Sequence, residues 1–486
     1  MLWPRWLFLR ALGLIFFSAF YALAFQMHGL IGEWGILPAG LSLDRISTAF
    51  GPLARVWFAP TLLWINSNDS ALTLIAAAGL IASVLLVLNV WPKLTVALCT
   101  VLFLSCIATL QDFSSYQSDG MLLEAGFLSI FFAPRGVRPG LGATDPPSRF
   151  SLFMLRWEWF RIYFESGLVK LLSGDHHWRN FTAMDDYYQN APLPSWMGWY
   201  VQQLPHWYHA GTVVIILVVE LVLVWAVFLP RRFRVACFLF VTALQIGIIA
   251  TANYGFLNYV VLALGVLLLD DRALTQVGFP CVSSVPPANT SRSRICRRAE
   301  TAVLGLAFYT TIVAFLFGSS DSILALPSRL LQPFRIANAY GLFAIMTPAR
   351  YEIEFQGSND GKTWVAYPFR YKPQDPMERP GFDGPYQPRL DWNLWFASLA
   401  PWGSSPWVVL TEERLLEGSP SVLALFRADP FHGKQPSMVR TVLWQYSFTD
   451  LETKRRTGAW WRRQELGPFS PGVTRAMDGS TVLTAP

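Results

Sequence analysis

The sequence predicts a polytopic α-helical membrane protein with about nine transmembrane helices, followed by a C-terminal, mainly-β, sandwich-like soluble domain. Of the 486 residues, 53% are apolar and 14% are charged, whereas soluble globular chains carry about 25% charged residues. The apolar residues gather in long runs that are hydrophobic on every side, unlike the one-sided pattern of a soluble helix. The last third of the chain instead alternates polar and apolar residues. These observations separate a membrane part from a soluble part.

The predicted transmembrane helices lie within nine hydrophobic segments. A bilayer core about 30 Å thick needs about 20 helical residues, and fewer suffice when flanking side chains snorkel. In chain order the segments are Leu12–Phe25, Leu72–Val90, Leu94–Leu110, Gly120–Ala133, Leu152–Leu172, Gly211–Leu229, Val235–Ala250, Tyr254–Leu269 and Ala302–Gly318. Two are weaker candidates, because Gly120–Ala133 is short and carries Glu124, and Leu152–Leu172 holds five charges.

The first segment admits two interpretations. Arg5 and Arg10 precede it, and Ala22-Leu23-Ala24 has the A-x-A form of a signal-peptide cleavage site. The spans that follow need no cleaved leader, so we expect the segment to remain as a helix.

The basic residues predict the orientation of the chain in the membrane. If the N-terminus lies inside and all nine segments span, the inside segments hold fourteen basic residues. The outside segments hold three, Arg45, Arg55 and Arg179. Cytoplasmic loops carry the excess of Lys and Arg. We therefore expect a cytosolic N-terminus and a C-terminal domain outside, in the periplasm or the lumen of the secretory pathway.

The C-terminal third is predicted to form antiparallel strands. Polar and apolar residues alternate in Tyr351–Gln356, Val365–Tyr371 and Val442–Phe448, and Ser358–Gly361 is a turn signal. A period of two with one buried face is typical of a small β-sandwich. The predicted divisions are a transmembrane domain at 1–318, a connecting segment at 319–350 and an extracytoplasmic β-rich domain at 351–486.

Composition and motifs argue against several function classes. The C-terminal domain holds none of the five cysteines, so we expect no disulfide framework there. The positive net charge comes mostly from the inside loops, so we expect no nucleic-acid partner. A P-loop, a dinucleotide fingerprint and a nucleophile elbow do not occur in a convincing context. We therefore expect no cofactor.

One predicted membrane segment contains an intramembrane polar cluster. Its members are Arg156, Glu158, Arg161, Glu165 and Lys170. Each of these charges would cost about 2.5–3.5 kcal/mol if it faced lipid at mid-membrane. Helical spacing puts Glu158, Arg161 and Glu165 on one face, where they can pair, and Lys170 on another. Two interpretations stay open: a self-neutralising helix packed in the bundle or at the interface, and a functional polar cavity.

A second group of polar residues is predicted in the outside loops. Its members are Asp119, Glu124, Asp175, His176, His177 and Arg179. Four of the six histidines lie between residues 173 and 210, and His206 and His209 have an i, i+3 spacing that a metal pair can use. No C-x-x-C or H-E-x-x-H motif accompanies them, so we expect solvated or interfacial histidines and no metal.

Several stretches resemble the lipase maturation factor family of membrane proteins. They are Gln117–Asp119 leading to Leu123–Phe127, Ser166–Leu171 with Gly174-Asp175 and Trp178-Arg179, Asn253–Asn258, Asn338–Phe343 with Met346-Thr347, and Glu352–Trp364 with Pro388–Trp392. Animal members reside in the endoplasmic reticulum membrane and help secreted homodimeric lipases fold and assemble. The resemblance implies a membrane-bound maturation factor or chaperone, not an enzyme, with a secreted lipase-like client outside and membrane lipid around it. The implied location is the endoplasmic reticulum membrane in a eukaryote and the cell (inner) membrane in a bacterium.

A more distant resemblance offers an alternative. Phe164–Leu171 is similar to a membrane segment of the vitamin K-dependent carboxylase superfamily, in which a lysine after an Ala/Ser-Gly pair acts as a base. Lys170 occupies that place. A lysine in a dry cavity can abstract a proton, so the alternative is a membrane-embedded enzyme with Lys170 as its base. Because the match is short, we favour a structural role for Lys170.

Overall fold

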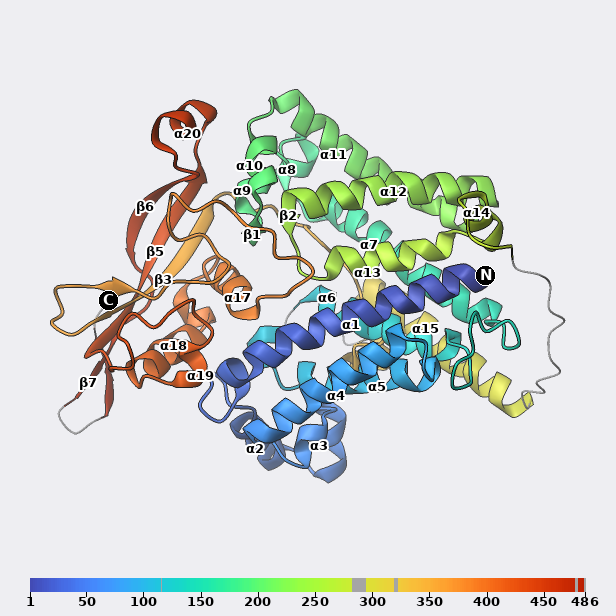
Figure 1. Cartoon of the computed structure of the whole chain (residues 1–486), viewed down its shortest axis with the longest axis horizontal. Coiled ribbons are helices and arrows are strands. Elements are labelled where there is room, and N and C mark those ends of the chain that lie inside the picture. Colours follow the sequence, from blue (N-terminus) through green and yellow to red (C-terminus); the bar gives the residue numbers. More distant parts are fainter. Residues whose placement is uncertain (115, 282–293, 319–321, 477–479, 485–486) are drawn as a thin grey trace.

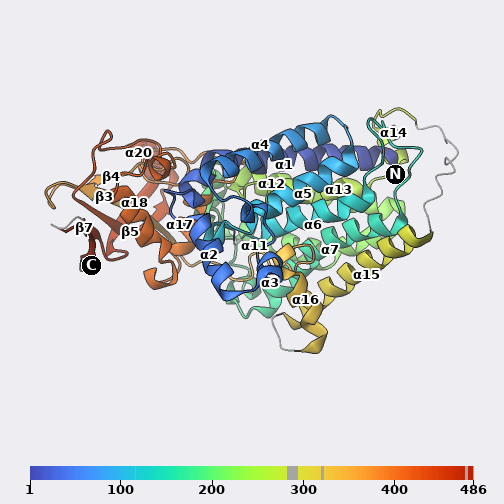
Figure 2. The same cartoon turned by 90° about the horizontal axis from the view of Figure 1, so that it is seen from below.

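A bundle of helices and a C-terminal region built on a β-sheet lie end to end in the computed structural model (Figure 1 and Figure 2). The structure describes residues 1–114, 116–281, 294–318, 322–476 and 480–484. The N-terminus lies at the end of the bundle that is far from the sheet. There the Met1 ammonium pairs with Asp271, and the Arg5 guanidinium donates to the carbonyls of Leu141 and Gly142. The loops around residues 141 and 271 therefore share this end with the N-terminus.

Each of the nine predicted hydrophobic segments is helical. The helices that contain them are α1 (Leu2–Ile31), α4 (Asp69–Val87), α5 (Pro92–Ile107), α6 (Gln117–Phe132), α7 (Arg149–Leu172), α11 (His206–Leu221) continued by η3 (Leu223–Phe228), α12 (Arg231–Thr251), α13 (Leu257–Gly265) continued by η4 (Val266–Leu268), and α15 (Arg294–Phe317). Among the described residues, five of these are long and apolar enough to cross a membrane: α1, α4, α11 with η3, α12 and α15. α5 and α13 with η4 are apolar but shorter. α6 has 16 residues, and α7 carries the five charges.

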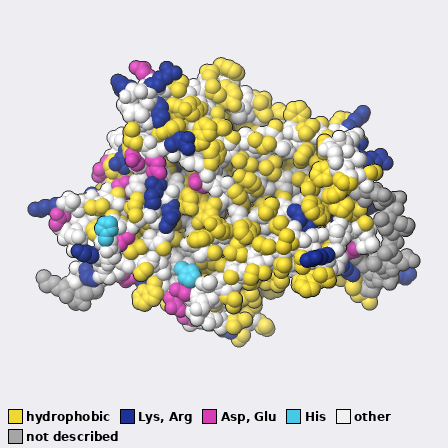
Figure 3. Space-filling view, viewed as in Figure 1, with side chains coloured by type: hydrophobic (Ala, Val, Ile, Leu, Met, Phe, Trp, Pro, Cys, Tyr) yellow, Lys and Arg dark blue, Asp and Glu magenta, His cyan; other side chains and the backbone are white. Residues whose placement is uncertain are grey.

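The surface of the bundle is apolar. Figure 3 shows hydrophobic side chains over most of its visible face, while Lys and Arg gather toward the N-terminal end and over the sheet region. Large side chains such as Leu74, Ile81 and Phe240 are more than half exposed. In water such a contiguous patch would be a liability, whereas in lipid it is the favourable surface. The helical part therefore has the exterior of a membrane bundle.

Close packing in the bundle depends on aromatic and small side chains. Phe16 and Phe20 of α1 make edge-on contacts with Phe103 of α5, with ring centroids 6.0 and 5.8 Å apart. Gly79 of α4 lies so near Phe20 that a Cβ there would overlap the ring. Small residues let membrane helices approach closely, and dispersion contacts then hold them together.

Short elements connect the long helices. They are α2 (Ala39–Ala49), α3 (Pro52–Phe58), η1 (Leu62–Trp64), η2 (Gln111–Ser114), α8 (His176–Arg179), α9 (Tyr187–Asn190), α10 (Trp196–Gln202), α14 (Asp271–Gln276), η5 (Ile323–Ala325), α16 (Leu326–Leu331) and η6 (Gln332–Phe334). A small antiparallel pair, β1 (Leu193–Pro194) with β2 (Ala252–Asn253), ties the loop after α9 to the end of α12.

The C-terminal region is organised around β5 (Met438–Phe448). β3 (Arg350–Ser358) runs antiparallel along one side of β5, with Ile353 opposite Leu443. The other side of β5 pairs with β6 and β7, and β4 and β8 extend the sheet. The bounds of the remaining elements are β4 (Val365–Ala366), β6 (Trp461–Pro468), β7 (Val473–Arg475), β8 (Thr481–Leu483), α17 (Arg389–Ala397), η7 (Trp402–Ser404), α18 (Trp407–Leu416), α19 (Pro420–Leu423) and α20 (Leu451–Thr457).

The predicted sandwich is wrong for the described residues after position 350. They form a single six-stranded sheet, on which α18 packs against β5 and β7 while α17 packs against β3. Trp407 and Leu415 of α18 are fully buried in this layer. A helix buries the apolar face of a sheet as well as a second sheet does. Alternation along the strands therefore did not distinguish the two architectures.

The predicted strand pattern also needs two corrections. Glu352 and Glu354 of β3 are buried, so both faces of this strand are covered. Glu352 can be buried because Arg350 and Lys372 pair with its carboxylate at 2.5 and 2.8 Å. In Val365–Tyr371, only the first two residues pair as a strand, and Pro368, which cannot donate to a ladder, follows them closely.

Candidate functional site

The polar residues of the bundle meet a short stretch of the connecting segment, residues 335–347, which we call the anchored segment. Its backbone amides donate to side chains of α6, α7 and the α7–α8 turn. The pairs are Asn338 to Glu124 (3.1 Å), Tyr340 to Glu165 (2.7 Å), Gly341 to Gln117 (3.0 Å), Leu342 to Ser166 (3.2 Å) and Met346 to Asp175 (2.6 Å). Five side chains thus satisfy five backbone amides of a segment that has no regular secondary structure of its own.

An ion pair between Arg161 of α7 and Glu124 of α6 forms the centre of this network. Both side chains are 1% exposed. Arg161 also donates to the carbonyl of Asn338 at 2.5 Å, and its guanidinium lies 5.1 Å from the ring centroid of Tyr340. The Tyr340 hydroxyl donates to Glu124 at 2.9 Å. A buried charge is tolerable when it is paired and hydrogen-bonded, and the anchored segment supplies most of the additional partners.

The charges of α7 do not neutralise one another within the helix. Arg161 pairs across to α6, and Glu165 accepts from the anchored segment. Glu158 is fully buried beside them. Arg156 points the other way and donates twice to the carbonyl of Leu267, at 2.9 and 2.8 Å. Arg156, Arg161 and Glu165 therefore contact three different parts of the fold.

Lys170 pairs with a residue that the sequence analysis missed. Its ammonium donates to both carboxylate oxygens of Glu220 on α11, at 2.8 and 2.9 Å, and lies 5.2 Å from the ring of Trp178. Gly167 makes room for this contact, because a Cβ there would lie 2.8 Å from that of Glu220. A lone acid inside the apolar run Gly211–Leu229 was the available signal, since intramembrane acids are rare.

A second buried ion pair joins the bundle to the C-terminal region. Arg389, the first residue of α17, donates to both oxygens of Asp119 on α6, at 2.9 and 2.8 Å. Both side chains are completely buried. Arg389 also donates to the carbonyl of Phe113, and its own amide donates to Gln26 of α1. Bidentate geometry makes this the stronger class of charged hydrogen bond, so we call it the clamp.

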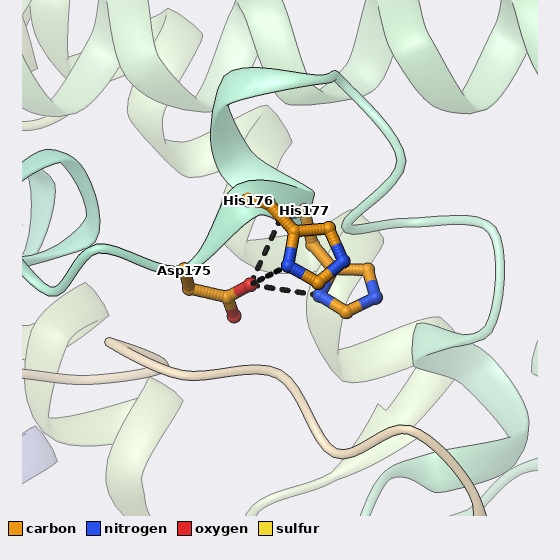
Figure 4. A group of neighbouring side chains, drawn as sticks. All are labelled: Asp175, His176 and His177. Carbon is orange, nitrogen blue, oxygen red and sulfur yellow. Dashed lines mark hydrogen bonds and ion pairs between the residues drawn. The ribbon is translucent and has the colours of Figure 1, made fainter.

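Asp175 links the loop after α7, where it lies beside His176 and His177 (Figure 4), to the anchored segment. One carboxylate oxygen accepts from the amide and the ring of His177, at 2.9 and 2.7 Å, and the other accepts from the amide of Met346. Although partial burial acts to raise the pKa of Asp175, these hydrogen bonds outweigh it and lower the pKa. His176 lies farther away, with its Nδ1 3.9 Å from Asp175.

The three side chains in Figure 4 offer ligand atoms within 4.8 Å of one another, as a metal site would require. Asp175, however, is already a hydrogen-bond acceptor for two backbone amides, which accounts for its position without an ion. His206 instead faces Asp185, with Nδ1 3.0 Å from the carboxylate, and His209 is buried against Tyr188. The i, i+3 pair of histidines does not form a common site.

The six residues predicted as one outside-loop cluster fall in separate places. Asp119 belongs to the clamp and Glu124 to the Arg161 pair, while Asp175, His176 and His177 lie together. Arg179 is exposed and donates to the carbonyl of Leu171 at 3.3 Å. Sequence order alone could not sort them, because the partners of Asp119 and Glu124 lie 270 and 37 residues away.

Comparison with known proteins identifies the family. The family model described as "Lipase maturation factor transmembrane domain" matches residues 3–276, and "Lipase maturation factor C-terminal domain" matches residues 336–471. The chain is 31% identical to lipase maturation factor 1 of Mus musculus over 500 residues, covering 96% of this chain and 86% of that protein. It is 30% identical to lipase maturation factor 2 of Gallus gallus over 587 residues, covering 97% and 81%. No solved structure matches.

These matches decide between the two resemblances found in the sequence. Both matching models describe lipase maturation factors, and the carboxylase-type alternative finds no support. Five helices of membrane-spanning length and apolarity, together with the transmembrane model, make the chain an integral membrane protein with a C-terminal β-sheet region. Over nearly its whole length, this chain belongs to the lipase maturation factor family.

Proposed function

We propose that this protein is a membrane-bound maturation factor that assists the folding and assembly of a secreted, lipase-like client, and that it is not an enzyme. The observation that carries the proposal is the clamp between Asp119 and Arg389, which fixes the sheet region on one end of the bundle. A catalyst of the carboxylase type would need Lys170 as a free base, whereas its ammonium is held by Glu220. The buried charges thus serve to hold a surface in place.

The proposed membrane arrangement has nine spans. The five long helices are joined by α5, α6, α7 and α13 with η4, which lie among them in the bundle (Figure 2). The N-terminus, with Arg5 and Arg10, and the loop at residues 134–148, with Arg135 and Arg138, lie at the end opposite the sheet, which supports a cytosolic N-terminus and an extracytoplasmic sheet region. The proposed domains are 1–318, a connecting segment at 319–350 and 351–486.

The proposed location follows from this arrangement and the family. It is the endoplasmic reticulum membrane if the organism is a eukaryote and the inner membrane if it is a bacterium. A reporter fused after residue 486 should appear in the lumen or periplasm, and one inserted between residues 280 and 298 should appear in the cytosol. Recovery of both reporters on one side would contradict the orientation.

A groove on the face of the sheet that carries Glu354 and Trp444 is the proposed contact for the client. It has a volume of about 670 Å³ and includes Trp364, Trp444 and Arg463. Arg463 lies 4.3 Å from the ring of Trp444, and Arg440 lies 4.0 Å from that of Trp364. The indole N–H of Trp444 has no partner among the described residues. Trp and Arg are the residues that most often dominate binding at protein interfaces.

The client role can be tested by coexpression with a secreted dimeric lipase. Trp364→Ala should lower the activity of secreted lipase without lowering the level of this protein, because the ring is half-buried at the groove. Trp402→Ala is the control, since Trp402 is a tryptophan of the same region, 39% exposed, that does not line the groove. Equal lipase activity with the two variants would reject the groove as the contact. Normal lipase activity in cells that lack the protein altogether would reject the client role.

A further inference from the structure

A cavity of about 300 Å³ lies inside the bundle, and the Lys170–Glu220 pair forms part of its lining. α7, α11, α12 and α13 form its walls, and the α8–α10 loops and the anchored segment cover it with Trp178, Tyr187 and Phe343. Its volume is at the lower end of the range for sites that bury a small organic ligand, about 300–1,000 Å³. None of the contacts described so far requires this space.

The cavity opens sideways, between α11 and α12. Ile215 of α11 and Gly247 of α12 both line it and are both exposed on the outer surface of the bundle. A Cβ added at Gly247 would meet nothing within 4 Å, so the opening is not filled by a neighbouring side chain. α11 and α12 belong to the five helices suited to span a membrane, and the opening therefore faces the hydrocarbon of the bilayer.

The inner end of the cavity is polar but carries no net charge. Lys170 is the one cation among the described lining residues, and Glu220 neutralises it. Beside this pair, Asn258 donates to Gln245 at 2.6 Å, and Gln245 donates to the Tyr163 hydroxyl at 2.7 Å. Because Tyr163 is the acceptor in that bond, its own hydrogen is available to another acceptor.

We propose that this cavity binds a neutral amphiphile from the membrane, an acyl chain that carries an uncharged hydroxyl or carbonyl group. The chain would lie between α11 and α12, where Ile215 and Ile248 supply apolar walls, and the oxygen would accept from Tyr163. An anionic headgroup would find Lys170 already neutralised and would lose its own hydration on entry. An apolar cavity open to lipid takes up hydrocarbon in preference to water.

The test uses the purified full-length chain in phosphatidylcholine vesicles and two photoreactive probes. One is a monoacylglycerol with a diazirine in its acyl chain, and the other is the same molecule with a phosphate on the glycerol. After illumination, labelled peptides are mapped by mass spectrometry. The neutral probe should label the cavity faces of α11 and α12, and the phosphate probe should label them about tenfold less.

Two substitutions separate binding in the cavity from lipid on the outer surface. Gly247→Leu fills the opening and should reduce labelling by the neutral probe about tenfold, because a well-filled site resists a second occupant. Leucine also has a higher helix propensity than glycine, so α12 should remain intact. The control is Ile246→Leu, since Ile246 is 57% exposed and lies outside the cavity lining.

Two results would overturn the proposal. Undiminished labelling of Gly247→Leu would mean that the probe adheres to the outside of the bundle. Equal labelling by the phosphate probe would mean that the site does not select a neutral headgroup. Maturation of a client plays no part in these measurements, so the outcome is independent of the proposed client role.

Discussion

Replacing Arg389 by methionine should loosen the attachment of the sheet region to the bundle. Methionine keeps much of the side-chain volume but removes the guanidinium, which leaves Asp119 buried without its bidentate partner. Both side chains are 0% exposed, so water cannot compensate for the loss. Breaking such a pair from one side typically costs about 3–5 kcal/mol of folding free energy. The carbonyl of Phe113 also loses a donor at 2.7 Å.

The assay is thermal unfolding of the detergent-purified chain together with limited proteolysis of the sheet region. Arg389→Met should lower the melting temperature and expose sites after residue 350 to protease. The double variant with Asp119→Leu should recover part of the loss, because no buried charge is then left unpaired. Arg462→Gln is the control, since its pair with Asp450 is more than half exposed on both sides and should contribute little. A double variant as unstable as the single one would refute the reasoning.

Three further predictions concern single sites. Burial raises the pKa of Glu412 to about 8, so between about pH 4.5 and 8 the folded chain keeps a proton that the unfolded chain has released. The free energy of unfolding should therefore fall as the pH rises through this range, by up to about 1.4 kcal/mol per pH unit. Glu412→Gln should flatten this pH dependence, measured by thermal unfolding at a series of pH values. Gly167→Ala should destabilise the chain by about 1–3 kcal/mol in thermal unfolding, because its Cβ would press on Glu220, while Gly211→Ala, with open space, should not. Lys170→Arg should retain protein level and client activity, whereas Lys170→Met should lower the level; a well-expressed but inactive Arg variant would contradict the structural role.

The helices could be predicted because their signal is local. A run of apolar residues in Leu72–Val90 or Val235–Ala250 forms a helix whatever its neighbours are, since lipid leaves no other way to satisfy the backbone. The charged residues of α7 were also recognisable as exceptions within such a run. What periodicity could not give was the partner of each charge, because Glu124, Asn338 and Glu220 lie on other elements.

The sheet region shows the opposite limit. Its strands β3 and β5 form where the sequence predicted strands, but burial does not alternate along β3. The charged Glu352 is buried there because it pairs with Arg350 and Lys372. The alternation of polar and apolar residues in the sequence shows which face of a strand is apolar. It does not show whether the polar side chains of the other face will be buried by ion pairs with residues elsewhere in the fold. The same limit explains why α17 and α18 were missed as the layer that covers the sheet.

The buried charges have a common consequence for the geometry of the whole molecule. The anchored segment enters β3 directly, and its amides are held by acids of α6 and α7, while the clamp holds the start of α17 to α6. The sheet region is therefore attached to the bundle at both of these places. Further hydrogen bonds add to them, such as those from Arg414 to the carbonyl of Gly35 (3.0 Å) and from Ser419 to the carbonyl of Trp34 (2.7 Å). Several separate attachments restrict rotation where a single one would permit it. In the proposed function, a client bound in the groove would therefore be held at a defined orientation relative to the bundle.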